Sequence, residues 1–427
     1  MKDSGIDWIG QIPESWEIIK TKNAFCNTKR IVGENHCKTE RLALTLNGVI
    51  KRDKEEADGL QPEKFDTYQF LYKNELVFKL IDLGNIATSR VGLSNYDGMV
   101  SPAYIILHND SENNRFYFYY FLSMWQRQIF NSLGDNGVRS SLNANDLLNL
   151  PMVRVSDSER IKIADFLDEK CAKIDSLIAH EQATIEELKI YKQSVITEAV
   201  TKGLDKTAPM KDSGVEWIGQ IPESWELSKL KYIGKFVKGP FGSAIKKSMF
   251  VIKADHTYKV YEQKNVIYKN MELGDYYITE SDFNTLSTFE VKEGDVLISC
   301  AGTIGANYIV PTRFEKGIIN QALMRVRLFN EIDKRLFVYI FLTILEQEIP
   351  KYSNGSAMKN IPPFDSLKNF FIPFPNLLEQ RQIADYLDKK CADIDSLISI
   401  KQQKIEELKE YKKSLIYEYV TGKKEVA

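Results

Sequence analysis

Glycine-containing loops of this chain carry basic, hydroxyl and amide side chains, which together suit the binding of a polyanion. Lys and Arg neutralise phosphates, while Arg, Asn, Gln and Ser can hydrogen-bond to the edges of bases. Taken singly, each side chain is explained by an ordinary solvated turn, but the set as a whole favours contact with DNA. The candidate residues are Arg90, Arg139, Ser140, Lys238, Ser243, Lys246, Lys247, Thr303, Asn354, Ser356 and Lys359.

These candidates lie in five segments whose composition is typical of turns. Two of the segments contain Asn-Gly, at 135–141 (DNGVRSS) and 353–359 (SNGSAMK), and such turns expose their polar side chains. The other three are 84–90 (GNIATSR), 238–247 (KGPFGSAIKK) and 300–305 (CAGTIG).

The spacing of reactive residues does not favour a catalytic centre. Residues 360–364 (NIPPF) come nearest, because adenine methyltransferases carry Asn or Asp before Pro-Pro-aromatic. Here Ile361 occupies the position that must hydrogen-bond to the target amine, and an isobutyl group cannot do so. No phosphate-binding GxxxxGK[ST] loop, no cofactor-binding glycine loop and no Ser/His/Asp or Cys/His triad spacing is found. We therefore expect a non-enzyme.

Two segments of the chain occur twice. Residues 1–20 return at 210–229 with 16 of 20 positions identical, and residues 163–202 return at 383–422 with 26 of 40 identical. The intervening stretches, 21–155 and 230–375, barely resemble each other. We infer that the repeated segments build a frame and that the unlike stretches read different targets.

The longer repeat predicts a long helix in each copy. Ser156 and Asn376, each followed three residues later by a glutamate, have capping-box spacing, and Gly203 and Gly422 supply the ends. Apolar residues step by four and three through more than four heptads, which predicts a coiled coil of helices about 42 residues and roughly 60 Å long. The assigned core comprises Leu167, Cys171, Ile174, Ile178, Glu181, Ile185 and Leu188, and Leu387, Cys391, Ile394, Ile398, Lys401, Ile405 and Leu408.

Polar residues interrupt this seam at matching positions, with Glu181 and Lys401 in one slot and Lys192 and Lys412 in another. One alternative is that these side chains lie along the seam with their charged ends in water. The other is that Glu181 and Lys401 meet where two antiparallel helices cross, and so set the register. The linker 202–209 reaches under ~30 Å, too short to run back along a helix, so we expect antiparallel pairing with an unlike domain at each end.

The shorter repeat places tryptophans on both sides of a Gly/Pro turn, at Trp8 and Trp16 and again at Trp217 and Trp225. Stacking on bases is conceivable, but packing is favoured, because a segment that reads different targets has no reason to be duplicated. Residues 420–421 repeat residues 200–201, which lead into the second copy. We therefore expect the C-terminus to lie near Met1, in a circular layout.

The unlike stretches mix short strands with one helical run each, at 115–130 and 335–349. The expected fold is α+β, with two mixed α/β recognition domains joined by two long antiparallel helices in a pseudo-two-fold, circular repeat. The expected boundaries are 1–155 (with the repeated segment 1–20), a spacer helix at 156–203, 204–375 (with the repeated segment 210–229) and a second spacer helix at 376–422.

Composition narrows the class further. The chain has 427 residues, 43% hydrophobic, and a net charge of −2, which is not the bulk signature of a nucleic-acid binder but does not exclude one. The apolar runs are too short to cross a membrane, and no signal peptide is seen, so a cytoplasmic location is expected. The five cysteines and four histidines show no metal-ligand spacing, and reduced thiols are expected.

A resemblance to a known protein family extends across essentially the whole chain. The segments that carry it are the doubled SG[IV][DE]WIGQIPESWE, the CAGTIG segment followed by residues 319–321 (INQ), and LLEQRQIADYLDKK. The chain resembles the specificity subunit of type I DNA restriction–modification systems. In the first copy, residues 158–163 (SERIKI) depart from the LLEQRQI form.

The resemblance implies a non-catalytic subunit whose two domains each read half of a split site in double-stranded DNA. It further implies methyltransferase (modification) subunits docked on the long helices, and restriction (nuclease-translocase) subunits. S-adenosylmethionine, ATP and Mg²⁺ would serve those partners, with no cofactor in this chain. A coiled-coil scaffold whose unlike domains bind proteins is the alternative.

Overall fold

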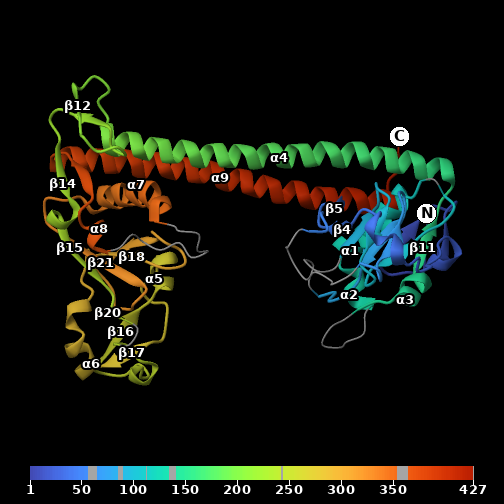
Figure 1. Cartoon of the computed structure of the whole chain (residues 1–427), viewed down its shortest axis with the longest axis horizontal. Helices are drawn as coiled ribbons and strands as arrows, with labels where there is room; N and C mark the ends of the chain where they lie inside the picture. The colour runs from blue at the N-terminus through green and yellow to red at the C-terminus, as the bar shows by residue number, and fades with distance from the viewer. Residues whose placement is uncertain are drawn as a thin grey trace. The chain divides into compact units, whose positions relative to one another are not determined.

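The structure, a computed structural model, describes residues 1–55, 65–84, 90–111, 113–133, 141–241, 244–352 and 364–426, with the backbone alone over 348–352. The chain divides into two compact units. Unit 1 contains Met1–Ala183 and Lys401–Ala427, and unit 2 contains Thr184–Ile400. Each unit mixes helices with small sheets (Figure 1), so the fold class is the α+β class that the sequence predicted.

Unit 1 is built around a three-stranded antiparallel sheet, ordered β10-β7-β8, that packs on α1 (Arg115–Gln126). The sequence of α1, RFYFYYFLSMWQ, is apolar on nearly every side, so this helix can form stably only when buried. Phe78 of β7 meets Phe121 of α1 edge-on, with ring centroids 5.2 Å apart. The unit 1 strands are β1 (Lys2–Asp3), β2 (Gln11–Ile12), β3 (Glu17–Lys20), β4 (Leu42–Thr45), β5 (Gly48–Lys51), β6 (Gln69–Leu71), β7 (Leu76–Lys79), β8 (Arg90–Leu93), β9 (Gly98–Val100), β10 (Ile105–Leu107) and β11 (Pro151–Arg154).

The helical run expected over 115–130 is interrupted in the structure. It consists of α1 and a short α2 (Ile129–Leu133), separated at Arg127 and Gln128. Gln128 has a φ of +58°, in the left-handed region that ends a right-handed helix. The remaining short helices of unit 1 are α3 (Ala144–Asn149), η1 (Thr21–Asn23) and η2 (Gly33–Cys37).

Unit 2 contains a four-stranded antiparallel sheet, ordered β15-β21-β18-β19, covered by α7 (Lys334–Tyr352). A second sheet, ordered β17-β16-β20, pairs β16 with β20 in parallel. The strands are β12 (Met210–Asp212), β13 (Gln220–Pro222), β14 (Glu226–Lys229), β15 (Gly234–Lys238), β16 (Thr257–Tyr261), β17 (Tyr277–Thr279), β18 (Val296–Ser299), β19 (Asn307–Ile309), β20 (Gly317–Ile319), β21 (Leu323–Leu328) and β22 (Phe371–Phe374). The short helices are α5 (Gln263–Ile267), α6 (Glu280–Thr285), α8 (Phe364–Leu367), η3 (Leu230–Tyr232), η4 (Lys247–Met249) and η5 (Ser287–Phe289).

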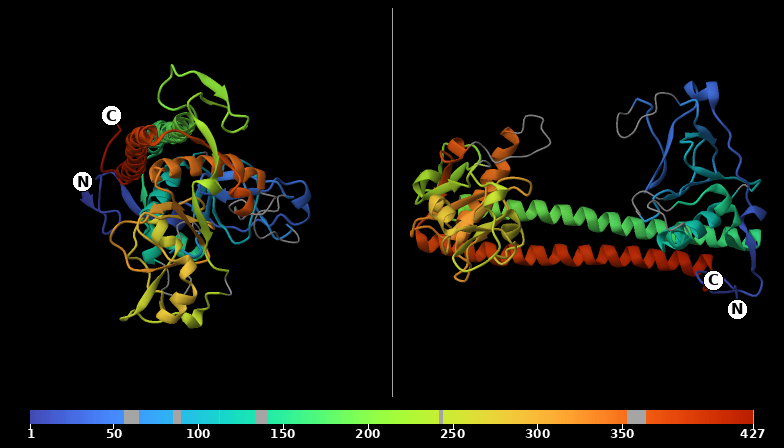
Figure 2. Two further views of the ribbon diagram at one scale, coloured as in Figure 1. Left: turned by 90° about the vertical axis from the view of Figure 1, so that its left-hand side faces the viewer. Right: turned by 90° about the horizontal axis from the view of Figure 1, so that it is seen from below.

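The two long helices are α4 (Asp157–Lys202, 46 residues) and α9 (Leu377–Val420, 44 residues), slightly longer than expected. Within each unit they lie side by side and run in opposite directions (Figures 1 and 2). In unit 1, Phe166 packs against Tyr419 and Asp175 pairs with Lys412. Residue numbers therefore increase along α4 in the direction in which they decrease along α9. The expected antiparallel pairing is therefore present in each unit.

The helix starts form as the spacing predicted. Asn376 caps α9 by accepting a hydrogen bond from the Glu379 amide at 3.0 Å, and Ser156 accepts from the Glu159 amide at 3.4 Å. The glutamate side chains, however, turn to tryptophans of the shorter repeat. Trp16 donates its indole N–H to Glu159 at 3.0 Å, and Trp225 donates to Glu379 at 2.9 Å.

A second repeated contact joins each domain helix to a long helix. In unit 1, Arg115 pairs with Asp165 and Asp168, and the Tyr119 hydroxyl donates to Asp168 at 2.7 Å. The copies 220 residues later make the same bonds in unit 2, between Arg335, Tyr339, Asp385 and Asp388. The frame is thus duplicated in its contacts as well as in its sequence.

The chain ends meet within unit 1, as the circular layout predicted. The Lys423 ammonium donates to the carbonyl of Ile9 at 2.6 Å, and Gly422 lies against Pro13 and Trp16. Figure 1 shows the two termini close together. In unit 2, Gly203 at the end of α4 lies in the same way against Trp225.

Candidate nucleic-acid interface

Two of the predicted contact residues, Lys238 and Thr303, lie at the same end of the four-stranded sheet in unit 2. Lys238 ends β15, and Thr303 is in the loop that follows β18. Gly239 and Cys300 each lie one residue beyond their strand. The Gly239 amide donates to the Leu323 carbonyl and the Cys300 amide to the Ala322 carbonyl, each at 2.8 Å. Both loops are therefore anchored to the segment that opens β21.

Glycine is required where the first of these loops turns. A β-carbon at Gly239 would lie 1.8 Å from the backbone oxygen of Asn320, and no flexible side chain is there to move aside. The loop backbone therefore packs directly on the 320–321 segment, where Gln321 is exposed. This places an amide side chain beside the loop that carries Lys238.

Hydrogen bonds from α5 hold the CAGTIG loop, residues 300–305, in place. Gln263 of α5 donates its side-chain N–H to the Ser299 hydroxyl at 2.8 Å and to the Ala301 carbonyl. Gly302 and Gly305 take left-handed φ angles of +64° and +80°, which lets the exposed Thr303 stand at the tip. The loop therefore presents an ordered polar surface at this end of the sheet.

Cys300 at the base of this loop is a packed thiol. It is 9% exposed, and burial raises the pKa of the Cys300 thiol to about 11, against a smaller opposing effect of the nearby Lys238 ammonium. A thiol in this state is neutral at physiological pH and unsuited to nucleophilic chemistry.

Phe241 was not among the residues predicted from the sequence. Its side chain is 88% exposed, three residues after Lys238, while its neighbour Pro240 is buried. An aromatic ring held out in water beside lysines suits contact with bases, because apolar side chains can insert between base steps. The sequence signal that could have identified Phe241 is a single aromatic residue within a Gly-Pro-Phe-Gly segment.

Lys246 and Lys247 belong to a different part of unit 2. Both are exposed, and the adjacent Ile245 is buried in the core of the β17-β16-β20 sheet, against Val260 and Ile278. The structure therefore does not gather all the candidates of the 238–247 segment at one place.

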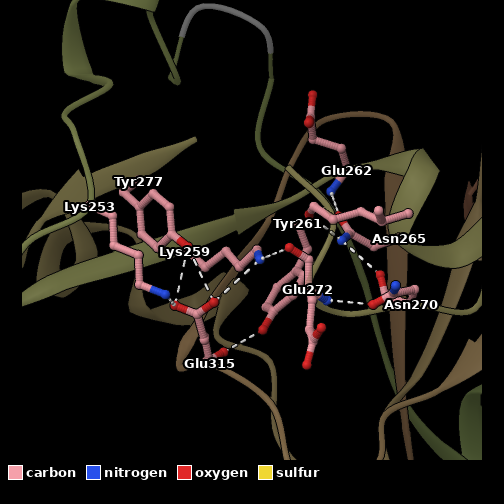
Figure 3. Close-up of polar contacts among 10 residues, drawn as sticks. Lys253, Lys259, Tyr261, Glu262, Asn265, Asn270, Glu272, Tyr277 and Glu315 are labelled. Atoms are coloured by element: carbon pink, nitrogen blue, oxygen red, sulfur yellow. Dashed lines mark hydrogen bonds and ion pairs between the residues drawn. The ribbon is translucent and has the colours of Figure 1, made fainter. Parts of the chain in front are cut away.

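A buried lysine braces this second sheet (Figure 3). Lys259 of β16 is 1% exposed; its ammonium donates to the carbonyl of Glu272 at 2.8 Å and lies 3.4 Å from Glu315. Lys253 and the Tyr277 hydroxyl also reach the Glu315 carboxylate, at 2.8 and 3.1 Å. Burial raises the pKa of Glu315, but these partners outweigh it and hold the pKa below its usual value. A carboxylate paired in this way serves as a brace and is poorly placed to accept a proton.

The neighbouring surface is a hollow of about 960 Å³, lined by Phe250, Tyr276, Lys253, Arg313 and Glu315 among others. Phe250 and Tyr276 stack on each other with centroids 4.4 Å apart. One face of each ring is therefore covered by the other ring.

In unit 1, Arg90 opens β8 and is half-buried. Its guanidinium donates to the carbonyl of Leu44 at 2.9 Å and lines a hollow of about 550 Å³ shared with Asn47 and Lys412. Part of its hydrogen-bonding capacity is thus used within the protein. The candidates outside the described residues are Arg139, Ser140, Ser243, Asn354, Ser356 and Lys359, as are most residues of the two Asn-Gly segments.

The predicted coiled-coil core follows the expected alternation. Leu167, Cys171, Ile174 and Ile185 of α4 are buried, as are Leu387, Cys391, Ile394 and Ile405 of α9. Half-buried positions lie between them at Ile178, Leu188, Ile398 and Leu408. At the polar positions, Lys401 pairs with Glu181 at 2.8 Å, Lys192 pairs with Asp395 and Lys412 with Asp175, each at 2.6 Å. The charged ends are therefore paired across the helices, and Glu181 meets Lys401 as the register predicted.

The described part of the chain contains neither a candidate metal site nor a candidate membrane span. No group of three or more His, Cys, Asp or Glu side chains there has the geometry to hold a metal ion. No helix within the described ranges is long and apolar enough to span a bilayer.

Comparison with known proteins gives consistent matches. Residues 222–410 match the family model of the type I restriction modification DNA specificity domain. The MjaX specificity subunit of a type I restriction enzyme from Methanocaldococcus jannaschii is 25% identical over 445 residues, covering 97% of this chain and 95% of that one. The MjaVIII specificity subunit of the same organism is 28% identical over 276 residues, covering 62% and 60%.

Solved structures share the fold. A chain from a study of complex assembly and conformational transition in a type I R-M system superimposes with a TM-score of 0.71 at 15% identity, covering 96% of this chain and 98% of that one. The HsdS subunit from Thermoanaerobacter tengcongensis gives a TM-score of 0.52 at 14% identity, covering 99% and 100%.

Proposed function

We propose that this chain, which belongs to the family of type I restriction–modification specificity subunits, reads a bipartite, asymmetric DNA site. Each unit would recognise one half-site through its own loops. The observation that carries this proposal is the contrast between frame and loops. The joints Trp16–Glu159 and Trp225–Glu379 are copies, whereas the sheets and loops that they hold are unlike.

In unit 2 the surface proposed to meet DNA is the sheet end that carries Lys238, Phe241, Thr303 and Gln321. Lys238 would neutralise a phosphate, and the threonine and glutamine would hydrogen-bond to base edges. Phe241 would contact bases through its exposed ring.

Partner docking is proposed for the outer faces of the long helices. Unit 1 exposes Leu177 and Tyr411, and unit 2 exposes their repeat equivalents, Leu397 and Tyr191, each 48–58% exposed. Apolar side chains left in water at equivalent positions suit two equivalent partners. We propose that methyltransferase subunits bind there and that restriction subunits join the complex.

The catalytic chemistry is assigned to those partners. S-adenosylmethionine would serve methylation, and ATP with Mg²⁺ would serve restriction, in the partner subunits and not in this chain. This chain would contribute target choice alone.

Salt-dependent DNA binding tests the proposal. The chain, alone and with its methyltransferase subunit, is titrated with duplex DNA at several NaCl concentrations. Several phosphate contacts predict a steep fall of log K with log salt. The alternative, a coiled-coil scaffold whose unlike domains bind proteins, predicts no such slope in either preparation.

A length change tests the bipartite reading. Inserting one heptad into α4 and one at the equivalent place in α9 should alter the gap between the methylated half-sites and leave their sequences unchanged. Methylome sequencing of a host that carries the variant with its methyltransferase reads both features at once. Altered half-sites with an unaltered gap would contradict the role of the helices as a spacer.

A further inference from the structure

Over positions 167–192, the seams of the two long helices are identical with one exception, at their centre. From position 167 to 192, the residues of the α4 seam and their α9 equivalents 220 residues later are Leu/Leu, Cys/Cys, Ile/Ile, Ile/Ile, Glu/Lys, Ile/Ile, Leu/Leu and Lys/Lys. The single difference is Glu181 against Lys401. Over this stretch, each helix could pair with its own kind as readily as with the other helix, unless position 181/401 distinguishes them.

The antiparallel register brings this position onto its own copy. Asp175 pairs with Lys412 on one side of it, and Glu181 itself contacts Lys401 at 2.8 Å and Lys404 at 2.6 Å. In an antiparallel pair of repeated helices, residues away from the centre meet non-equivalent partners, and the central residue meets its equivalent. Glu181 and Lys401 occupy that centre.

The other ion pairs of the coil cannot distinguish the helices. The Asp175–Lys412 pair in unit 1 and the Asp395–Lys192 pair in unit 2 are repeat copies, because both helices carry Asp and Lys at the same positions. An α4 paired with a second α4 would re-form both bonds, between Asp175 and Lys192. Their charges therefore hold the helices together without selecting which helices pair.

The central position is different, because self-pairing would oppose like charges there. Glu181 is 4% exposed, so two such carboxylates facing each other would be buried without a counter-ion. The lysine next to the centre would also be missing, since the α4 equivalent of Lys404 is Thr184. Two α9 helices would instead bring Lys401 and Lys404 against their own copies. Like charges forced together disfavour the wrong partner.

We propose that Glu181 with Lys401 and Lys404 is a partner-selecting site, which makes the coiled-coil seam pair α4 with α9 and neither helix with its own kind. The partner that this surface fits is the opposite half of this chain, whether from the same molecule or from a second copy. The proposal goes beyond DNA reading and does not depend on it.

A cut-chain exchange experiment tests the selection. A protease site is placed in the exposed linker at 204–207, and the folded full-length protein is cut so that both halves remain together. Cut wild-type protein is mixed with isotope-labelled, cut E181K/K401E/K404E protein, annealed through mild denaturant and counted by native mass spectrometry. We expect matched halves to exceed mismatched halves by about tenfold or more. Equal amounts of the four combinations would overturn the proposal.

A neutral variant separates selection from stability. E181L/K401L removes the charges at positions 181 and 401 and fills the seam with apolar side chains, which often hold as well as a buried ion pair. Its cut halves should form α4–α4 complexes that the wild type lacks. Wild-type halves that form as many α4–α4 complexes as the neutral halves would refute the selection.

The matched control reverses an exposed charge pair on the same helix. E406K/K409E exchanges residues that pair with each other along α9, at 2.7 Å, without reaching α4. Its cut halves should exchange at random with wild-type halves. Discrimination by this control equal to that of the triple reversal would also overturn the proposal, because any reversed charge on the helix surface, and not the central position, would then explain the choice.

Discussion

At the residue scale, the loop side chains differ in what remains available for a ligand. Lys238 is exposed at the end of a strand, whereas Arg90 already donates to the carbonyl of Leu44. Thr303 is exposed in a loop whose base is held by hydrogen bonds from Gln263 to Ser299 and Ala301. Exposure and support together make Lys238 and Thr303 the strongest of the described candidates.

Replacing Lys238 by Ala should weaken DNA binding about equally for all sequences and reduce the slope of log K against log salt by about 1, because one phosphate contact is lost. Fluorescence anisotropy at several NaCl concentrations, with the methyltransferase subunit present, measures both quantities. Lys235→Ala is the control, since Lys235 is exposed on the same strand three residues away from the loop. An equal effect of the two substitutions would argue against a contact at the sheet end.

Glu181 should give the protein a defined response to acid. Hydrogen bonds from Lys401 and Lys404 lower the pKa of Glu181 from 4.5 to about 2. A depressed pKa stabilises the folded state fully above the unfolded value, and this contribution is lost as pH falls from about 4.5 towards 2. The difference in Tm between wild type and Glu181→Gln should therefore be constant at neutral pH and shrink below about pH 4.5.

Thermal unfolding followed by circular dichroism from pH 3 to 8 measures that difference. Glu406→Gln is the control, because Glu406 pairs with Lys409 on its own exposed helix face. A Tm difference for Glu181→Gln that stays unchanged down to pH 3 would contradict the assigned cause.

At the element scale, the long helices end where a left-handed residue meets a buried tryptophan. Gly203 has a φ of +71° and lies against Trp225, and Gly422 has a φ of +68° and lies against Trp16. Each tryptophan is 1% exposed and also holds the glutamate at a helix start. One side chain thus connects the start of one long helix with the end of the other.

Replacing Gly422 by Ala should destabilise unit 1 through two effects. The left-handed backbone alone costs an alanine about 1–2 kcal/mol. The new β-carbon would also lie 2.3 Å from the Pro13 ring, and such overpacking costs roughly 1–3 kcal/mol more. Denaturant unfolding of the full chain measures the sum. Gly5→Ala is the control, because Gly5 has a φ of +69° with nothing within 4 Å.

At the scale of the whole molecule, the chain is closed into a circle by contacts inside unit 1. Lys423 bonds to Ile9, the N-terminus lies 3.4 Å from Glu14, and Gly422 packs on Trp16. The corresponding joint of unit 2 is made by a continuous chain through the exposed residues 204–207. The two joints therefore share the packing of a helix-ending glycine on a tryptophan.

A circular permutant follows from this equivalence. Joining Ala427 to Met1 by a short glycine-serine linker and opening the chain between Lys206 and Thr207 should give a folded protein. Its Tm should lie within a few degrees of wild type, because no packed segment is interrupted. Thermal unfolding and the methylated sequence in a host carrying the methyltransferase are the two measurements. A permutant that stays unfolded would show that the contacts in unit 1 need the native terminus.

The two long helices and their contacts could be predicted from the sequence, because the features that determine them are local or periodic. The caps at Ser156 and Asn376, the glycines that end the helices and the seam around Glu181 all depend on spacing along one helix. Repetition supplied the rest, since two copies of one segment must make the same contacts. The break at Gln128 was not predicted, because nothing about glutamine as a residue type indicates that its backbone will adopt a left-handed φ.

Spacing and repetition in the sequence predicted the frame: two long helices, their antiparallel pairing and the closure of the chain ends. They left two alternatives open at Glu181 and Lys401, and the structure shows that these side chains meet. The sequence did not predict which loop residues lie together in the folded protein. Lys238, Phe241 and Thr303 share one sheet end because β15 and β18 both pair with β21, whereas Lys246 and Lys247 lie with the other sheet. Pairing between strands far apart in the chain is set by the packing of the whole core, and local spacing does not encode it.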